Sequence, residues 1–521
     1  KLGVDVIVAE DIANNAITVA ELADNAVTTA KLNADAVTGA KIADDAIDSE
    51  HYTDGSIDLA HLSSESVDES KLKVSNAPTN GYVLTAQSGN TGGLTWAAAS
   101  GVTSLGDLSD ATTTATSNIG LGANAVDSIT TGDYNVGIGD TSLTAVTTGS
   151  FNNAIGYAAG TAITTGNHNV AIGRLTLYNA TTPDNNTAVG NGAMQATTTG
   201  AHNTAVGMNS LNANTTGDEN VALGKGSLDA NTTGVQNTGI GTGSLSDQTT
   251  GSNNVAVGRN SLGSNTTASN NVAVGHSALV LNTTGFDNVA VGRQSLDANT
   301  TANYNTAIGS IALSANTTGA NNTTVGYASL NLNTTASNNT AMGYAALNAN
   351  TTGTENVAVG YKALTTNTTA NNNTSVGSSA LELNTTGAEN SALGYSALYA
   401  NTTGANNTAV GRSALAANTT GTANSAVGKS SLDANTTGNY NSAMGRDSLG
   451  ANTTGSSNTG IGFEALAANT TASENSALGM YALKANTTGD ENVAIGFRAL
   501  LTNTTGSGLV ALGKDALKAN T

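Results

Sequence analysis

The 17-residue stretch "NVALGKGSLDANTTGVQ", residues 220–236, is written again with small changes along most of the chain. The copy that starts at residue 254 reads "NVAVGRNSLGSNTTASN", and the copy at residue 288 reads "NVAVGRQSLDANTTANY". A unit of fixed length predicts that each copy folds as one coil of a solenoid and packs against its two neighbours. An enzyme active site, in contrast, needs a unique place in the chain.

The array occupies residues 118–521 and contains 24 copies without insertion or deletion, the last one incomplete. The first position is Asn in 23 consecutive copies, the fourth is always Val, Ile, Leu or Met, and the fifth is Gly in all 24. The residues expected to define the repeat, taken from two of the copies, are Asn220, Leu223, Gly224, Leu228, Asn231, Thr232, Thr233, Val257, Gly258, Leu262 and Asn265.

Each copy predicts a flattened coil of a parallel β-roll, so the expected fold class is an all-β solenoid. "NVAVG" reads as a short strand ended by glycine and "NTT" as a second β-prone segment, so we expect two strands and two turns per coil. Coils stacked about 4.8 Å apart would give a rod roughly 115 Å long. The glycine at position 5 requires a positive φ or a close backbone neighbour. Position 15 also accepts Ala268 and Pro183, which predicts a negative φ there.

Position 12 changes character along the array. It is apolar or small in the first copies (Ile129, Val146, Ile163, Ala180, Thr197) and, apart from Gln248, is Asn from residue 214 onward. Stacked Asn side chains can hydrogen-bond to one another along a fibre axis. We therefore expect an asparagine ladder over most of the rod and a more apolar start.

The composition narrows the classes of protein to which the chain can belong. The chain has 61 Gly, 2 Pro, no Cys, 10% charged residues and a formal net charge of −20. A strongly acidic chain is unsuited to nucleic acid, which requires clustered Lys and Arg. No run of about 18 apolar residues predicts a transmembrane helix, so no membrane insertion is expected. Charged residues avoid the predicted strands and favour the turns, which we expect to face water.

Two further segments precede the array. Residues 1–72 contain a ten-residue repeat, such as "ELADNAVTTA" and "KLNADAVTGA", which predicts an N-terminal trimeric stalk. Residues 73–117 form a joint in which the alternating "YVLTA" and Trp96 indicate a small β-element. His51 and His61 share one position of the ten-residue repeat, so a trimer could place them in rings; surface histidines are the simpler interpretation.

The number of chains follows from the sparse apolar content. Burying a few Val and Leu side chains per coil offsets little of the entropy lost in ordering 17 residues. A second apolar surface between chains would supply more, and we expect a parallel homotrimer.

The sequence shows no set of residues with the pattern of a catalytic, cofactor-binding or metal-binding site. We predict no catalytic, cofactor-binding or metal-binding residues and hence no enzyme; a depolymerase would need paired acids in a cleft. Two alternatives concern the "NTT" segments, which are formally glycosylation sequons and also form a Thr array that could bind ice. An asparagine ladder explains the same residues at least as well.

The repeats resemble those of known fibrous proteins. "NTAVGRSALAANTTGTA", residues 407–423, is similar to repeats in bacteriophage tail fibres and related bacterial surface proteins. "NSAVG" and "NVAIG", at residues 424 and 492, also resemble the heads of trimeric autotransporter adhesins, which are parallel β-rolls, although the adhesin repeat is usually shorter than 17 residues. The ten-residue repeats and "APTNGYVLTAQSGNTGGLTW" are similar to segments of phage tail fibres.

The resemblance implies a structural role. We expect a stiff trimeric spacer in a phage tail fibre, with other virion tail proteins near its N-terminal side and a host receptor, for example a carbohydrate, near its C-terminal side. The expected location is the virion or, for the alternatives of a cell-surface adhesin or an extracellular filament, the cell surface. Many such fibres continue into a self-cleaving chaperone domain, so we expect a fragment or a processed product.

Overall fold

The computed structural model describes residues 82–86, 94–98, 111–112 and 117–520. The ten-residue repeats of residues 1–72, with His51 and His61, lie outside the described residues, so the stalk stays a prediction. The chain divides into two compact units, Lys1–Gly101 and Val102–Thr521, and each is described by itself.

The first unit contains a β-hairpin. Strands β1 (Tyr82–Ala86) and β2 (Leu94–Ala98) pair antiparallel, with Leu84 opposite Trp96. The Thr85 hydroxyl donates a hydrogen bond to the Thr95 carbonyl at 3.2 Å. This hairpin is the β-structure that the alternating "YVLTA" and Trp96 indicate.

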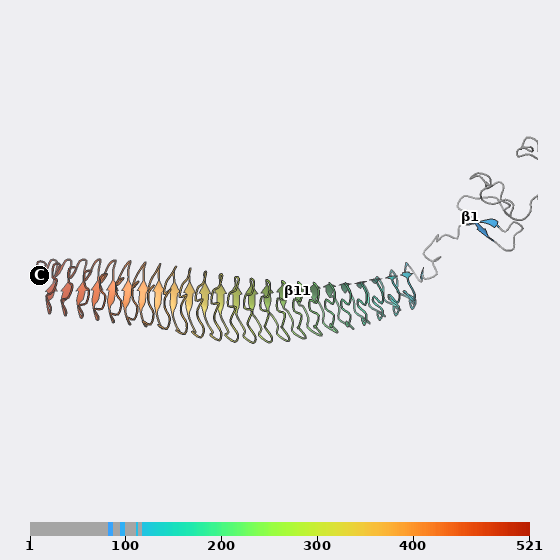
Figure 1. The fold of residues 1–521 in the computed structure, drawn as a ribbon, viewed down its shortest axis with the longest axis horizontal. Helices are drawn as coiled ribbons and strands as arrows, with labels where there is room; N and C mark the ends of the chain where they lie inside the picture. The colour runs from blue at the N-terminus through green and yellow to red at the C-terminus, as the bar shows by residue number, and fades with distance from the viewer. Residues whose placement is uncertain (1–81, 87–93, 99–110, 113–116, 521) are drawn as a thin grey trace, which may run out of the picture. The chain divides into compact units, whose positions relative to one another are not determined.

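The second unit is a parallel β-solenoid, in which the coils stack in single file (Figure 1). A two-residue strand, β3 (Ala111–Thr112), precedes 24 strands of three residues, one from each copy of the repeat. The strands are β4 Ile119–Leu121, β5 Val136–Ile138, β6 Asn153–Ile155, β7 Val170–Ile172, β8 Thr187–Val189, β9 Thr204–Val206, β10 Val221–Leu223, β11 Thr238–Ile240, β12 Val255–Val257, β13 Val272–Val274, β14 Val289–Val291, β15 Thr306–Ile308, β16 Thr323–Val325, β17 Thr340–Met342, β18 Val357–Val359, β19 Thr374–Val376, β20 Ser391–Leu393, β21 Thr408–Val410, β22 Ser425–Val427, β23 Ser442–Met444, β24 Thr459–Ile461, β25 Ser476–Leu478, β26 Val493–Ile495 and β27 Val510–Leu512.

Consecutive strands pair in parallel with a constant register of 17 residues. Val221 lies opposite Thr238 and Ala222 opposite Gly239, and the same offset recurs along the array. At one end of the sheet β3 pairs antiparallel with β4, and at the other β27 pairs with β26. The solenoid of 17-residue coils predicted from the sequence is therefore confirmed.

The prediction of two strands per coil is wrong, because the "NTT" segment makes no strand ladder. In the coil of residues 220–236, the backbone N–H groups of Thr232 and Thr233 both donate to one carbonyl, that of Thr249 in the next coil, at 2.9 and 3.3 Å. A parallel ladder needs donors and acceptors that alternate along the strand. The β-propensity of threonine is overridden here by the turn that the segment makes.

The interior of the solenoid is thin and built from small residues. Positions are counted from the asparagine that opens each copy, so Asn220 is position 1. Ala222 at position 3 and Leu228 at position 9 are both fully buried, and their equivalents form one continuous core. The position-4 side chains that follow the buried alanine point the other way, because successive residues of a strand face opposite sides.

Candidate functional surface

The glycine at position 5 is required by both conformation and space. Gly224 has a φ of +131°, and a Cβ placed on it would lie 2.7 Å from the carbonyl carbon and oxygen of Gly241. Every coil shows the same close stacking of position 5 on position 5 of the next coil up to Gly496. Position 15, by contrast, has no positive φ in the coils described, as its acceptance of alanine and proline indicates.

Two rows of buried asparagines run along the solenoid. Asn231 at position 12 donates from Nδ2 to Asn214 Oδ1 of the preceding coil at 3.0 Å, which confirms the predicted ladder. Asn220 at position 1 donates in the same way to Asn203 Oδ1 at 3.1 Å. Both side chains also donate to the carbonyl of Gly234, at 3.0 and 2.9 Å. The two rows therefore hold the position-15 turn from both sides.

The burial of the asparagines at position 12 decides how the "NTT" sequons are used in the folded array. Asn214, Asn231 and Asn265 at position 12 are fully buried, and each donates its amide to the carbonyl at position 15 of its own coil. A glycan on Nδ2 would replace these hydrogen bonds and fill the core. In the folded array, these sequons therefore serve as a structural ladder.

The two threonines of each "NTT" segment have different surroundings. Thr232 at position 13 donates its hydroxyl to the Thr249 carbonyl at 3.0 Å, so this hydroxyl links neighbouring coils. Thr233 at position 14 is exposed. A single exposed rank of threonines results, whereas a flat two-rank lattice is wanted for ice binding.

Left-handed backbone conformations recur at positions 7, 9 and 17. Leu228 has a φ of +54° and Gln236 of +57°, and position 9 is left-handed along the whole array. Such conformations cost about 1–2 kcal/mol for a residue other than glycine. Full burial of the leucine side chain offsets this cost. Nothing in the sequence signals it, because leucine carries no left-handed preference.

The outer face of the sheet carries an apolar ridge, which we define as the side chains at position 4 of every coil, Leu121 to Leu512. Many of them are exposed although all are Val, Ile, Leu or Met: Leu393 is 52% exposed and Met444 54%. In a single chain the leucines at position 9 are therefore buried, whereas this second apolar row lies at the surface. A three-residue strand is too short to reveal from its sequence which of its faces is inside.

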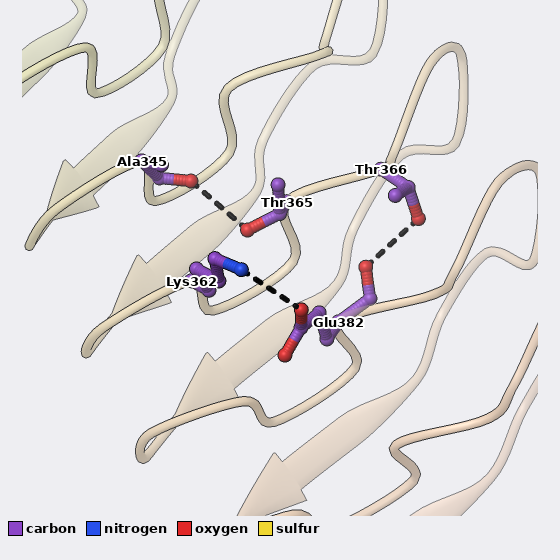
Figure 2. Close-up of polar contacts among 5 residues, drawn as sticks. All are labelled: Ala345, Lys362, Thr365, Thr366 and Glu382. Atoms are coloured by element: carbon purple, nitrogen blue, oxygen red, sulfur yellow. Dashed lines mark hydrogen bonds and ion pairs between the residues drawn. The ribbon is translucent and has the colours of Figure 1, made fainter.

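The turn that follows each strand carries charged and aromatic side chains. Figure 2 shows this turn in three consecutive coils: Lys362 Nζ lies 3.7 Å from Glu382 Oε1, and the Thr366 hydroxyl donates to the Glu382 carbonyl at 2.8 Å. Thr365 donates to the Ala345 carbonyl at 3.0 Å. These side chains are partly exposed, as predicted for charges at turns.

Aromatic rings stack at equivalent positions of adjacent coils. Tyr344 at position 6 stacks between Tyr327 and Tyr361, with ring centroids 5.4 Å apart on each side. At position 17, Phe151 stacks between Tyr134 and His168 at 5.0 Å. Because stacked rings cover one another's faces, these rows reinforce the stacking of coils.

Three carboxyl groups at position 10 are partly desolvated. Burial raises the pKa of Asp229, Asp297 and Asp433 above the usual 3.8, while backbone hydrogen bonds oppose the shift. The neighbouring carboxylates of Asp247 and Asp447 add to the shifts of Asp229 and Asp433. The shifts therefore reflect burial and neighbouring charge within the turn.

The part of the chain that the structure describes contains no cluster of His, Asp or Glu able to hold a metal ion. It also contains no helix long and apolar enough to cross a membrane. The repeat residues named from the sequence lie together in each coil, with Gly224, Leu228 and Asn231 building the coil itself.

The comparisons with known proteins give no match: no family model, no curated protein and no solved structure matches the chain. The geometry of the repeated coil is therefore the basis for assigning a function.

Proposed function

We propose that the chain is a structural fibre, a stiff trimeric spacer of a phage tail fibre that presents a receptor-binding tip. The observation that carries the proposal is the exposed apolar ridge, a continuous row of Val, Ile, Leu and Met on a repeat that has no place for a unique catalytic site. Monomeric soluble proteins rarely expose long contiguous apolar surfaces. Covering the ridge with further copies of the chain accounts for it.

Stiffness along the axis supports a spacer role. Each coil is joined to the next by the strand hydrogen bonds, by the Asn rows and by the Thr232-type hydroxyls. These bonds run along the solenoid, and the strand hydrogen bonds recur from coil to coil without an inserted loop. Bending the rod would lengthen many of them together.

Solution mass and electron microscopy test the proposal at two levels. Sedimentation of the full chain should give three times the mass of one chain, and a monomer would contradict the trimer. Immunogold labelling of the native source, with antibody against the 17-residue array, should mark thin appendages of tailed particles.

Label on cell envelopes or on free filaments, with none on particles, would overturn the tail-fibre assignment. It would favour a cell-surface adhesin or an extracellular filament, for which the same ridge and axial hydrogen bonds would serve.

A further inference from the structure

The apolar ridge is large enough for a specific interface. The strip spanned by positions 2 and 4 is about 115 Å long for 24 coils and about 7 Å wide, roughly 800 Å². That is the area each partner contributes to a protein–protein interface of standard size. Position 2 is Val in some coils and Thr or Ser in others, so its polar members lie beside the ridge.

Opposite charges border the two sides of this strip. We call positions 16 and 17, which precede the strand, the acidic edge, and positions 6 and 7, which follow it, the basic edge. The acidic edge carries ten carboxylates and no Lys or Arg: Asp133, Asp184, Asp218, Glu219, Asp287, Glu355, Glu389, Glu474, Asp490 and Glu491. The basic edge carries ten of the twelve array cations: Arg174, Lys225, Arg259, Arg293, Lys362, Arg412, Lys429, Arg446, Arg498 and Lys514.

The basic edge also carries four acids: Asp140, Asp447, Glu464 and Asp515. These acids, and carboxylates at position 10 such as Glu382 beside Lys362, offset part of the positive charge of that edge, whereas the acidic edge has no Lys or Arg at all. In a chain of net charge −20, such segregation on the two sides of one apolar strip requires a cause.

The segregation distinguishes between two ways of placing copies together. If neighbouring copies run parallel and turn their strips toward one another, the acidic edge of each faces the basic edge of the next. If they run antiparallel, the acidic edge faces another acidic edge. Like charges placed together at an interface cost several kcal/mol, whereas complementary edges favour association.

We propose that copies of this chain associate through the strip in parallel and in axial register, with the acidic edge of one copy against the basic edge of the next. Register follows from closure, because parallel chains related by rotation about the fibre axis have no axial shift. This proposal rests on the self-association in the proposed function and on the parallel homotrimer expected from the sequence, and it adds the register and the contacting edges.

Four coils carry both charges on either side of the same strand. The pairs are Glu219 with Lys225, Asp287 with Arg293, Glu355 with Lys362, and Glu491 with Arg498. In each coil the central strand begins with valine, at Val221, Val289, Val357 and Val493. In register, each such acid meets the cation of the same coil in the neighbouring copy.

Disulfide trapping tests the proposal, since the chain contains no cysteine of its own. The double variant Asp287→Cys/Arg293→Cys places one thiol on each edge of a single coil. Within one chain the strand Val289–Val291 lies between the two positions and spans about 7 Å, and each thiol lies a further two residues beyond it, which is too far for a disulfide. Oxidation should therefore link different chains, and covalent oligomers should appear on a denaturing gel.

Two matched controls shift the second cysteine by one coil. His276→Cys and Ser310→Cys, each combined with Asp287→Cys, occupy position 6 of the coil before and the coil after. The in-register pair should crosslink at least ten-fold faster than either control. Faster crosslinking of a control would overturn the register.

The Asp287→Cys single variant tests the orientation, because among these arrangements only chains that meet acidic edge to acidic edge can link through it alone. Efficient dimerisation of that variant would overturn the parallel arrangement. Sedimentation of the same samples separates the two proposals. Associated chains with the wrong crosslinks overturn only this inference, whereas chains that remain monomeric overturn the trimeric fibre as well.

Discussion

The two asparagine rows are both fully buried, yet one is almost invariant and the other is not. Position 1 is Asn from residue 118 to residue 492, whereas position 12 begins with Ile129, Val146 and Ile163. Both rows donate to the same turn: Asn288 and Asn299 bond the Ala302 carbonyl at 2.8 and 3.1 Å. The side-chain N–H groups of the two rows therefore donate to the same acceptor.

The rows differ in what their side-chain oxygens accept. Asn288 Oδ1 accepts the backbone N–H of Asn305 in the next coil at 3.0 Å, whereas Asn299 Oδ1 accepts the side chain of Asn316 at 3.1 Å. Position 1 thus satisfies a buried backbone group that is present in every coil, whatever the sequence. The side-chain oxygen at position 12 accepts only from the side chain at position 12 of the next coil. Apolar residues can therefore replace this row without leaving a backbone N–H unpaired.

Removing one amide from the first row should have the largest effect. Asn288→Ala leaves the buried N–H of Asn305 without its acceptor and should destabilise that coil by about 2–4 kcal/mol. Hydrogen exchange of peptides around residues 280–310 should show loss of protection there. Unchanged protection would mean that the first row is not required for stacking.

The same test on the second row should give a smaller effect. Asn299→Val keeps a buried, well-filled position, but it leaves Asn282 Oδ1 without its donor and one N–H of the Asn316 amide without its acceptor. We expect about 1–2 kcal/mol of destabilisation in the same exchange experiment. A loss equal to that of Asn288→Ala would contradict the distinction between the rows.

Repairing the ladder should stabilise the rod. Gln248 interrupts the second row: its amide nitrogen donates to the Gly251 carbonyl, and Asn231 Oδ1 is buried without a hydrogen-bond partner. Gln248→Asn should restore that bond and add about 1 kcal/mol. Thr197→Asn, which extends the row by one coil, is a matched variant, and slower exchange near each site is the expected result.

The smallest effect concerns a charge beside the second row. Because burial raises the pKa of Asp297 above the usual 3.8, protonation favours the folded coil, and this stability is lost as pH rises through the raised pKa. Asp297→Asn should therefore stabilise the coil at pH 7 by less than about 1 kcal/mol, since the group is half exposed. The gain should vanish below pH 3.8; a gain that persisted there would contradict an electrostatic cause.

The features that could be predicted from the sequence are those that depend on the constant length of the repeat. The 17-residue coil, the glycine of position 5 and the ladder at position 12 follow from residues that recur at one spacing, and the structure confirms each. The prediction that failed concerns the second strand: β-propensity suggested a strand at Thr232 and Thr233, but the tertiary turn overrides it. Apolar character alone also did not show that Leu393 lies on the outer face.

Two further features could not have been predicted from residue type. The left-handed conformation of Leu228 is imposed by the closure of the coil, since leucine itself favours other regions. The segregation of charge on the two sides of the strand was visible in the sequence only once the structure had fixed which positions flank the apolar strip.

The most direct test of the account is cryo-electron microscopy of the purified chain viewed in cross-section. The account predicts three parallel solenoids in register, with coils about 4.8 Å apart and with the position-4 ridges facing the common axis. Single solenoids, or an assembly in which the ridges face solvent, would contradict it.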